Sequence, residues 1–493
     1  MKISKAKRVI YFFIILCLYL PVESNNLVIS GVARTGIDRD VIIANISWEN
    51  SWNVTGIPQN HDAVWLFIKF RECETGGNWN HALLSTNMSD HTCGADITWA
   101  QPITNTDRLG VAGNHNTGVM IRRSDYGTGN ISSQNVSLRV VGSTSGMSLI
   151  DTIEYDIKVL GIEMVYIPEG PFYIGDGTSS GFIFTPGTNP RLPYYVNSEA
   201  SVNVGYYSCY SGTYRNVTLN ASFPKGYAAF YYMKYEITQG QYCDFLNTIH
   251  INAALNRAFI TVNYMYDIAL NKGVYISRYP DRAMIYMTYR DMLSYLDWAA
   301  LRPPTEMEFE KACRGPLDYV PGEFAWGTDT YIEAINVSGT ESGTEICTDS
   351  AANLHFSGAD VFCHGGAFGT SFRGPLEVGI FARKTTTDRV ETGGTYYGLM
   401  EMSGNVSEMC VQININDGNP STPSGYTGIW GDGILTPDGN YNTVGWNGAE
   451  FFICKGGNYL TSFDYARISN RYYSNRTNQD ARNYYDYGGR GCR

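Results

Sequence analysis

Two acidic residues, Glu401 and Glu408, carry the clearest chemical signal in the sequence. They stand seven positions apart in the segment 398–408, GLMEMSGNVSE, with Gly404 between them. Calcium takes roughly six to eight hard oxygen ligands, and two carboxylates around a glycine that permits a tight turn supply some of them. The segment therefore predicts a calcium site. The alternative is that both carboxylates are solvated surface acids around a structural turn.

Other combinations of reactive side chains are weaker signals. Cys363 and His364 are neighbours, but a nucleophilic pair needs a third group to orient the imidazole, and a disulfide or a surface loop is the favoured interpretation. The seven histidines lack metal-ligand spacing, and the sequence contains no CxxC, HExxH, GxSxG, GxxxxGK or EF-hand pattern. The sequence therefore does not predict a zinc site, a serine hydrolase or a phosphate-binding loop.

The C-terminal segment 456–493 is dense in Tyr, Asn and Arg. Tyr offers a large amphipathic contact area at a small entropic cost, Arg offers forked hydrogen bonding, and Asn adapts to its partner, so this composition is typical of binding surfaces. The alternative is a core loop held by its own hydrogen bonds. The predicted binding surface consists of Asn458, Tyr459, Phe463, Tyr465, Arg471, Tyr472, Tyr473, Arg476, Tyr484 and Tyr485.

The elements that must position these residues differ between the two parts of the chain. From about residue 27 to residue 160, β-branched and aromatic runs such as 41–48, 63–70 and 136–141 alternate with Gly, Asn and Asp clusters, which predicts strands. We expect an all-β sandwich over 25–160 and a second domain over 161–493. The overall class is α+β.

Three helix starts are predicted in the second domain from patterns typical of capping boxes. Each pattern places a threonine three residues before a side chain that can reach back to the threonine's backbone amide. The three begin at Thr238, Thr288 and Thr305, and the first helix is expected to carry Tyr242, Phe245, Leu246 and Ile249 on one face. After about residue 330 the periodicity fades and long loops are expected.

The N-terminus has the pattern of a secretory signal peptide. Four basic residues precede an apolar run over 9–20 that is short for a membrane span, and small residues follow near position 24. Removal of residues 1–24 moves the formal charge from −11 to −14. We expect a secreted or cell-surface protein with no remaining transmembrane segment and no affinity for nucleic acid, because phosphate contacts need local positive charge.

Ten cysteines follow the predicted signal peptide. An even number in a secreted chain permits disulfides, and Cys73 with Cys93 is the most local pairing. Cys243 and Cys313 instead fall on predicted helix faces, where a cysteine behaves as a small apolar residue.

Five segments of the chain closely resemble the formylglycine-generating enzyme (sulfatase-modifying factor) family. The resemblance covers about residues 160–493 and implies a variant of the C-type lectin fold, with few helices and much irregular structure. The segments are MVYIPEGPFYIGDG (164–177), RPPTEMEFEKACRG (302–315), FAWGT (324–328), YGLMEMSGNVSEM (397–409) and KGGNYLTSFDYARISNRYYSNRTNQDARNYYDYGGRGCR (455–493).

The resemblance also implies what the chain has lost. Enzymes of the family bind copper through two cysteines five positions apart after the GG(S/N)(Y/W) motif, and the matching positions here are Thr461 and Ala466. A hydroxyl and a methyl group cannot replace thiolates as ligands of Cu(I). Ser407 and Met409 also stand where family enzymes usually have tryptophan, the first of which lines the substrate groove. We expect no copper and lean towards a protein that is not an enzyme.

The resemblance further implies two calcium sites. The first uses Glu401, Glu408 and the carbonyls of Gly404 and Val406. The second matches Asn353, Leu354 and Phe372, but its acidic ligand falls near Thr370, a neutral residue.

Three functions remain open. The leading hypothesis is a secreted, non-catalytic family member that binds a protein or glycan, or other copies of itself, through its C-terminal face. This face either is fixed or resembles the variable proteins of diversity-generating retroelements, some of which use this fold. The alternatives are an oxidase or related enzyme whose active groups lie outside the family positions, and a structural subunit of a surface layer or filament.

Overall fold

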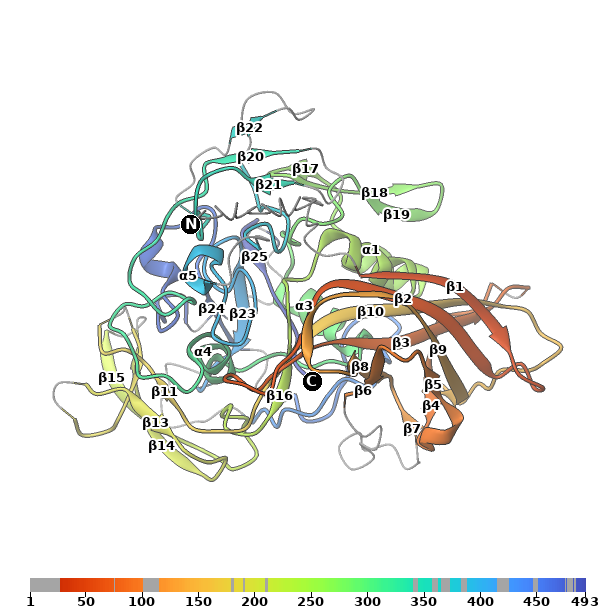
Figure 1. Cartoon of the computed structure of the whole chain (residues 1–493), viewed down its shortest axis with the longest axis horizontal. Helices are drawn as coiled ribbons and strands as arrows, with labels where there is room; N and C mark the ends of the chain where they lie inside the picture. The colour runs from red at the N-terminus through yellow and green to blue at the C-terminus, as the bar shows by residue number, and fades with distance from the viewer. Residues whose placement is uncertain are drawn as a thin grey trace, which may run out of the picture.

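A computed structural model describes most of the chain and shows two regions joined by shared strands (Figure 1). The residues described are 27–74, 76–100, 115–178, 181–188, 191–208, 212–339, 345–356, 362–364, 373–382, 388–414, 425–446, 451–474, 476, 482 and 485–493. The predicted signal peptide lies outside them. Within these ranges, no helix is both long and apolar enough to cross a membrane.

The N-terminal region consists of strands and one short 3-10 turn. Along β2 the alternate residues Ile42, Ala44, Ile46 and Trp48 are buried, because successive side chains of a strand point to opposite faces. The strands of this region are β1 (Val28–Thr35), β2 (Val41–Asn53), β3 (Asp62–Glu72), β4 (Asn80–Ser85), β5 (Thr92–Cys93), β6 (Ile97–Trp99), β7 (His115–Asn116), β8 (Val119–Arg123) and β9 (Gly127–Ser143).

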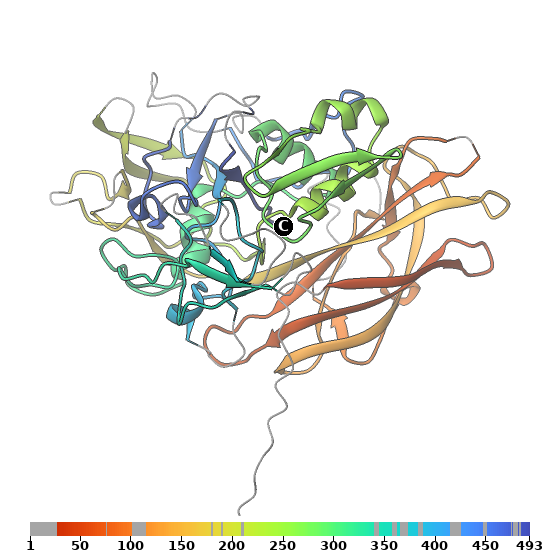
Figure 2. The same ribbon diagram turned by 90° about the horizontal axis from the view of Figure 1, so that it is seen from above.

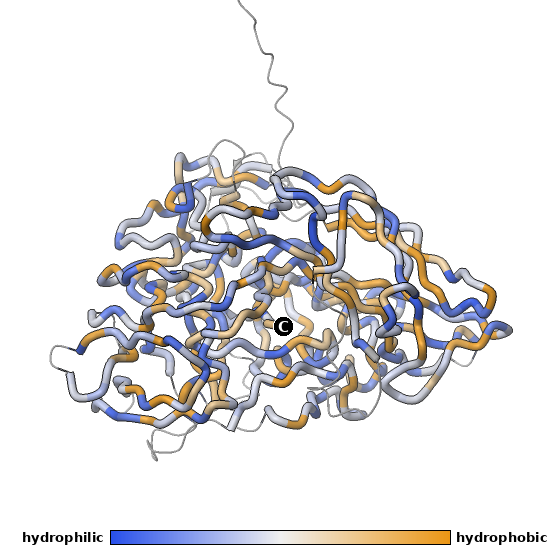
Figure 3. Tube along the Cα trace, turned by 60° about the horizontal axis from the view of Figure 1, so that its bottom comes forward, coloured by the Kyte–Doolittle hydropathy of each residue, from blue (hydrophilic) through white to orange (hydrophobic). Residues whose placement is uncertain are grey.

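Strand β3 is buried on both faces and lies at the centre of the molecule. Val64, Leu66 and Ile68 pack with β2 and β9 in one hydrophobic cluster. Ala63, Trp65 and Phe67 point the other way, into the large core of the second region. Strands buried on both faces read as continuous apolar runs, as this one does. Figure 3 shows such hydrophobic stretches along the long strands at the right of the view, between hydrophilic turns.

Strand β10 (Tyr155–Ile167) joins the two regions. It pairs with β3 along its whole length, from Tyr155 opposite Glu72 to Val165 opposite Asp62, and its end pairs with β16 (Phe230–Met233). The sheet order is β1-β2-β9-β4-β3-β10-β16, so one sheet runs through both regions. The boundary predicted between residues 160 and 161 falls inside β10, and the expected separate sandwich is not distinguished from the rest of the fold.

The three predicted capping boxes are all present. The side chains of Thr238, Thr288 and Thr305 each accept a hydrogen bond from the backbone amide three residues later, and the side chains of Gln241, Asp291 and Glu308 return to the threonine amides. The first helix ends at Asn247, so Ile249 lies beyond it. The helices are α1 (Gln239–Asn247), α2 (Ile251–Arg257), α3 (Tyr289–Trp298), α4 (Glu306–Arg314) and α5 (Arg389–Thr392). In Figure 2 the helices of residues 239–298 cover one side of the joint between the regions.

The rest of the second region is built from short strands and long loops, which agrees with the α+β class. A three-stranded sheet of β23 (Ser407–Val411), β24 (Phe452–Lys455) and β25 (Tyr487–Gly488) holds the candidate site. The other strands are β11 (Phe172–Ile174), β12 (Ile183–Phe184), β13 (Tyr194–Val196), β14 (Val202–Ser208), β15 (Thr213–Leu219), β17 (Val262–Asn263), β18 (Tyr266–Asn271), β19 (Val274–Ser277), β20 (Asn336–Ser338), β21 (Ile346–Cys347) and β22 (Phe362–His364).

Candidate functional site

The loop after β24 begins with two glycines that let the chain fold back on itself. Gly457 has φ +65°, and a Cβ added there would lie 2.7 Å from the Ala466 amide nitrogen. Gly456 has φ +81°, and its added Cβ would lie 2.9 Å from the Met402 carbonyl oxygen. Both the left-handed conformation and the close backbone approach require glycine. The Gly-Gly motif therefore has a structural role in this chain.

The positions that match the family's cysteines are used in packing and in a turn. The Thr461 hydroxyl accepts a hydrogen bond from the Asn458 amide at 3.0 Å and donates one to the Asn458 carbonyl at 3.2 Å. Ala466 ends the 3-10 helix η2 (Phe463–Ala466), is 1% exposed, and its carbonyl accepts the Ser403 hydroxyl at 2.7 Å. Neither side chain offers a soft ligand.

Ser407, at the position that lines the substrate groove in family enzymes, is buried and closes the base of this loop. The Asn458 side-chain amide donates to the Ser407 hydroxyl at 2.8 Å and to the Asp486 carboxylate at 2.9 Å. Asn458 is completely buried. The pair therefore fills, with small polar groups, the place where a large aromatic ring is expected in the family.

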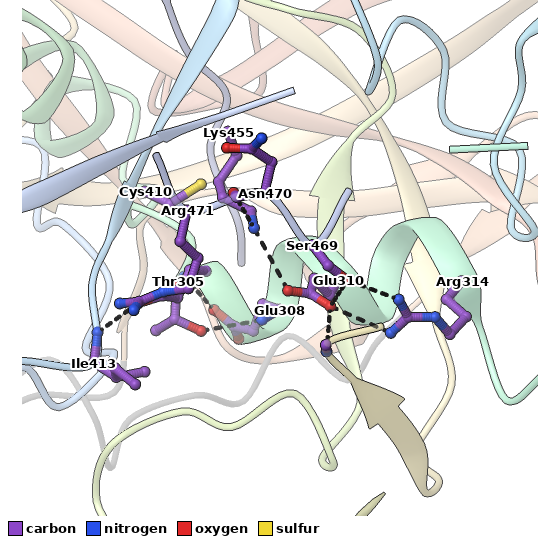
Figure 4. Close-up of polar contacts among 12 residues, drawn as sticks. Thr305, Glu308, Glu310, Arg314, Cys410, Ile413, Lys455, Ser469, Asn470 and Arg471 are labelled. Carbon is purple, nitrogen blue, oxygen red and sulfur yellow. Dashed lines mark hydrogen bonds and ion pairs between the residues drawn. The ribbon is translucent and has the colours of Figure 1, made fainter. Parts of the chain in front are cut away.

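Helix α4 fixes the far side of the same loop through its acidic residues (Figure 4). The Glu310 carboxylate accepts hydrogen bonds from Arg314 at 3.2 Å, from the Ser469 hydroxyl at 2.9 Å and from the Gly175 amide at 2.8 Å. Lys455 lies 3.5 Å from its other oxygen. Because every donor is buried with the carboxylate, the charges compensate one another out of water.

A second buried ion pair joins α4 to the loop. Arg471 Nε lies 2.6 Å from Glu306 Oε2 and Nη2 lies 3.0 Å from Oε1, a bidentate pair with both side chains 1% exposed or less. The Ile413 amide also donates to Glu306, at 2.8 Å. The sequence placed Arg471 on a binding surface, which is wrong because its guanidinium is enclosed by the fold.

Asn458 and Tyr459 are also wrongly placed by the surface prediction. Both are fully buried, and the Tyr459 hydroxyl donates to the Tyr485 carbonyl at 2.9 Å. The rings of Tyr459 and His355 are stacked with centroids 6.1 Å apart. Spacing in the sequence gave no sign that these polar tips have internal partners.

Other members of the predicted surface do reach solvent. Tyr472 is 49% exposed, its ring lies 5.0 Å from that of Tyr465 and 5.2 Å from that of Tyr473, and Arg476 lies over the Tyr473 ring at 4.7 Å. We call these four residues the tyrosine patch.

The remaining surface candidates lie apart from these contacts. Tyr485 stacks on Tyr264 at 4.5 Å, and Phe463 packs on Tyr331 at 5.1 Å. Tyr484 lies outside the described residues.

The predicted calcium carboxylates are buried, which excludes the alternative of solvated surface acids. Glu401 is 3% exposed and Glu408 is 1% exposed. One oxygen of each is paired, Glu401 Oε2 with the Gly379 amide at 2.8 Å and Glu408 Oε1 with Arg490 Nε at 2.8 Å. Within the described part of the chain, Glu401 Oε1 and Glu408 Oε2 are buried without a hydrogen-bond partner. Burial raises the pKa of both carboxyls to about 7.

A third carboxylate, Glu236, joins this cluster and was not found from the sequence. It accepts the Asn405 side-chain amide at 2.6 Å and the Val406 amide at 3.2 Å, and burial raises its pKa. Three carboxylates thus surround one guanidinium, that of Arg490. Two orphaned hard oxygens and excess negative charge suit Ca²⁺. No three His, Cys, Asp or Glu side chains of the described residues form a metal-binding group, so a cation here would need the carbonyls of Gly404 and Val406.

The second predicted calcium site has its ligands engaged by the protein. Asn353 Oδ1 accepts the Ile332 amide at 2.8 Å, and the Leu354 carbonyl accepts the Ala334 amide at 2.8 Å. The other candidates, Thr370 and Phe372, lie outside the described residues. The described part of this segment is therefore a hydrogen-bonded loop.

Burial keeps several thiols of the described chain protonated. Burial raises the pKa of Cys454 and of Cys243 to about 12. Cys243 and Cys313 are buried on their helices, as predicted. Cys73 and Cys93 are free cysteines, so the suggested disulfide between them is absent. Cys73 follows β3, whereas Cys93 lies in β5, which pairs with β9. A neutral thiol is a poor nucleophile and metal ligand.

The fold and site define a class of protein: an α+β domain whose C-terminal loop, residues 456–471, is held between α4 and the segment 398–408. The sequence matches the family described as "Sulfatase-modifying factor enzyme 1-like domain" over residues 155–488, and the chain belongs to this family. It is 27% identical over 140 residues to the formylglycine-generating enzyme of Thermomonospora curvata, a match that covers 28% of this chain and 36% of that protein. The match therefore spans about a third of that relative's length.

Proposed function

We propose that this protein is a secreted, non-catalytic member of the sulfatase-modifying factor family that binds a protein or glycan. The observation that carries the proposal is the pair of positions 461 and 466. Copper oxidases of this type need two thiolates there, and this chain has a threonine committed to a turn and a buried alanine. The basic and apolar N-terminal segment supports export.

The tyrosine patch is the proposed contact surface. It combines exposed aromatic area with the Arg476 guanidinium, the two side-chain types that are enriched at binding hot spots. Arg471, which precedes Tyr472 and is paired with Glu306 inside the fold, would hold this surface rigid. A rigid aromatic surface loses little entropy on binding. Self-association through the same surface is included in the proposal.

We also propose that Glu401 and Glu408 hold a calcium ion with the carbonyls of Gly404 and Val406. Such an ion would supply positive charge to a cluster of three buried carboxylates and would fix the turn that precedes β23. Its role would be structural, because the segment connects directly to the sheet that carries the loop.

The proposal is tested by mixing the purified protein with Cu(I), oxygen and a cysteine-containing sulfatase peptide. No formylglycine is expected by mass spectrometry, and clear turnover would refute the non-catalytic assignment. The double variant Thr461→Cys/Ala466→Cys is the matched comparison. We expect it to bind Cu(I) in competition with a chelator, whereas the unmodified protein does not.

A further inference from the structure

A polar pocket of about 460 Å³ lies where the N-terminal strands meet the second region. One wall comes from β3, β4 and the turn after β9. The other comes from the α1–α2 connection, the end of α3 and the loop 433–438. Its volume lies within the range of small-molecule sites, about 300–1,000 Å³. The sequence motifs of the family do not include it, and part of its lining, Lys69, Trp79 and Thr144 among it, comes from the N-terminal region.

The base of the pocket holds the buried amine of Lys69, which is 2% exposed. Its Nζ donates to the Gly433 carbonyl at 3.2 Å and lies 5.2 Å from the Trp298 ring centroid. Among the described residues it forms no ion pair. Burial lowers its pKa well below the ordinary value, and Asp297 and Asp432 oppose this effect only in part.

The nearest carboxylates are committed elsewhere. Asp297 accepts the Asp432 and Asn442 amides at 3.1 Å and 2.9 Å and the Thr443 hydroxyl at 2.6 Å. Asp432 Oδ1 accepts the Ile434 amide at 2.8 Å. These carboxylates hold the loop that covers the pocket. The Lys69 amine therefore retains donors that no carboxylate of the described chain satisfies.

The pocket walls suit a ring that carries hydroxyl groups. The ring of Trp79 is partly exposed, and Arg71 lies over it at 4.8 Å from the centroid. Polar side chains from both regions also line the pocket, including Asn80, His250 and Asn252. Asp438 is the acidic residue of the lining and lies on an exposed loop. An aromatic face beside amide and hydroxyl groups is the usual wall of a sugar site.

We propose that this pocket binds a small acidic sugar, with the ligand's carboxylate or sulfate paired to Lys69 and its ring against Trp79. A buried amine that makes no direct ion pair is stabilised when an anion binds to it, because two desolvated opposite charges attract strongly. The pocket would give the N-terminal strands a share in recognition. The inference is independent of the tyrosine patch and of copper chemistry.

Calorimetric titration of the full chain with D-glucuronate, inorganic sulfate and D-glucose tests the proposal. Saturable glucuronate binding is expected, with weaker binding of sulfate at the same site and none of glucose. Lys69→Met should weaken glucuronate binding at least tenfold, whereas the matched change Lys158→Met, at a half-exposed lysine paired with Asp244, should leave it unchanged. Trp79→Ala should weaken glucuronate but not sulfate.

Three results of these titrations would overturn the proposed sugar site. Absence of saturable binding of glucuronate and sulfate would overturn the proposal, as would equal binding of glucose or an unchanged affinity in a folded Lys69→Met variant. If Lys69→Met does not fold, protection from acetylation decides the question in the unmodified protein. Glucuronate should protect Lys69 and not Lys158, and lack of selective protection would refute the site.

Discussion

Truncation of Arg471 is the sharpest test of how the C-terminal loop is held. The change Arg471→Ala removes both bonds to Glu306, at 2.6 Å and 3.0 Å, and leaves that carboxylate buried with the Ile413 amide as its remaining described donor. Removing one partner of a buried ion pair costs about 3–5 kcal/mol, because the other charge stays desolvated. We expect a loss of this size in the free energy of unfolding.

The measurement is urea unfolding followed by near-ultraviolet circular dichroism, with thermal melting as a second readout. Each kcal/mol corresponds to roughly 2–4 °C in Tm for domains of about 150–250 residues, so the shift should be on the order of 10 °C. The matched control is Arg39→Ala. Arg39 also makes a two-pronged contact, with Glu154 at 2.9 Å and 3.4 Å, but both side chains are exposed.

An exposed pair of this kind contributes about 0–1 kcal/mol. The double variant Glu306→Gln/Arg471→Met should recover part of the lost stability, because it removes both buried charges. The reasoning fails if Arg471→Ala costs no more than Arg39→Ala. That result would mean that the loop is held by other contacts and that Arg471 is available to a partner, as its sequence position first indicated.

Three further predictions concern the loop, the joint between the regions and the calcium cluster. Gly457→Ala should lower the free energy of unfolding by at least 1 kcal/mol more than Gly76→Ala. Both glycines have positive φ (+65° and +57°), but only Gly457 has backbone atoms within 4 Å of the added Cβ. Equal losses for the two variants in urea unfolding would contradict a clash at Gly457. Burial, with a smaller contribution from Arg122, lowers the pKa of His61 to about 3, so the unfolded chain binds the extra proton as pH falls below about 6.5. Between pH 6.5 and pH 5 the free energy of unfolding should drop by roughly 2 kcal/mol more than in the His61→Gln variant. Parallel pH profiles of the two proteins would exclude this contribution of His61. Chelation of calcium should lower the Tm of the unmodified protein but not that of the Glu401→Gln variant. If calcium had been present at 100 times its Kd, the loss in the free energy of unfolding should be about 2.7 kcal/mol. An unchanged Tm in the unmodified protein would mean that the motif is only a turn.

Local signals in the sequence predicted local structure well. The capping boxes at Thr238, Thr288 and Thr305 depend on side chains three residues apart, and each formed as expected. Family membership followed from such local motifs.

Long-range partners were not predictable in the same way. Arg471 and Glu306 are separated by 165 positions, and Arg490 and Glu408 by 82. A Tyr, Asn or Arg in the C-terminal segment has the same local pattern whether its polar tip meets water or a buried carboxylate. Tyr472 is 49% exposed and Arg471 is fully buried, although the two are adjacent in the chain.

Buried charges tie the two regions together at their joint. Lys234 on the family side lies 3.2 Å from Glu163 in β10 and 3.8 Å from Asp62 in β3, all nearly inaccessible to solvent. Asp62 also accepts the Trp48 indole at 3.0 Å and the Ser51 hydroxyl at 2.7 Å. Because this triad spans β3 and β10, which pair from Tyr155 to Val165, the N-terminal strands and the second region should unfold together. The family domain of this chain is therefore completed by the strands that precede it, and its surface includes sites, such as the Lys69 pocket, that a domain limited to residues 161–493 would lack.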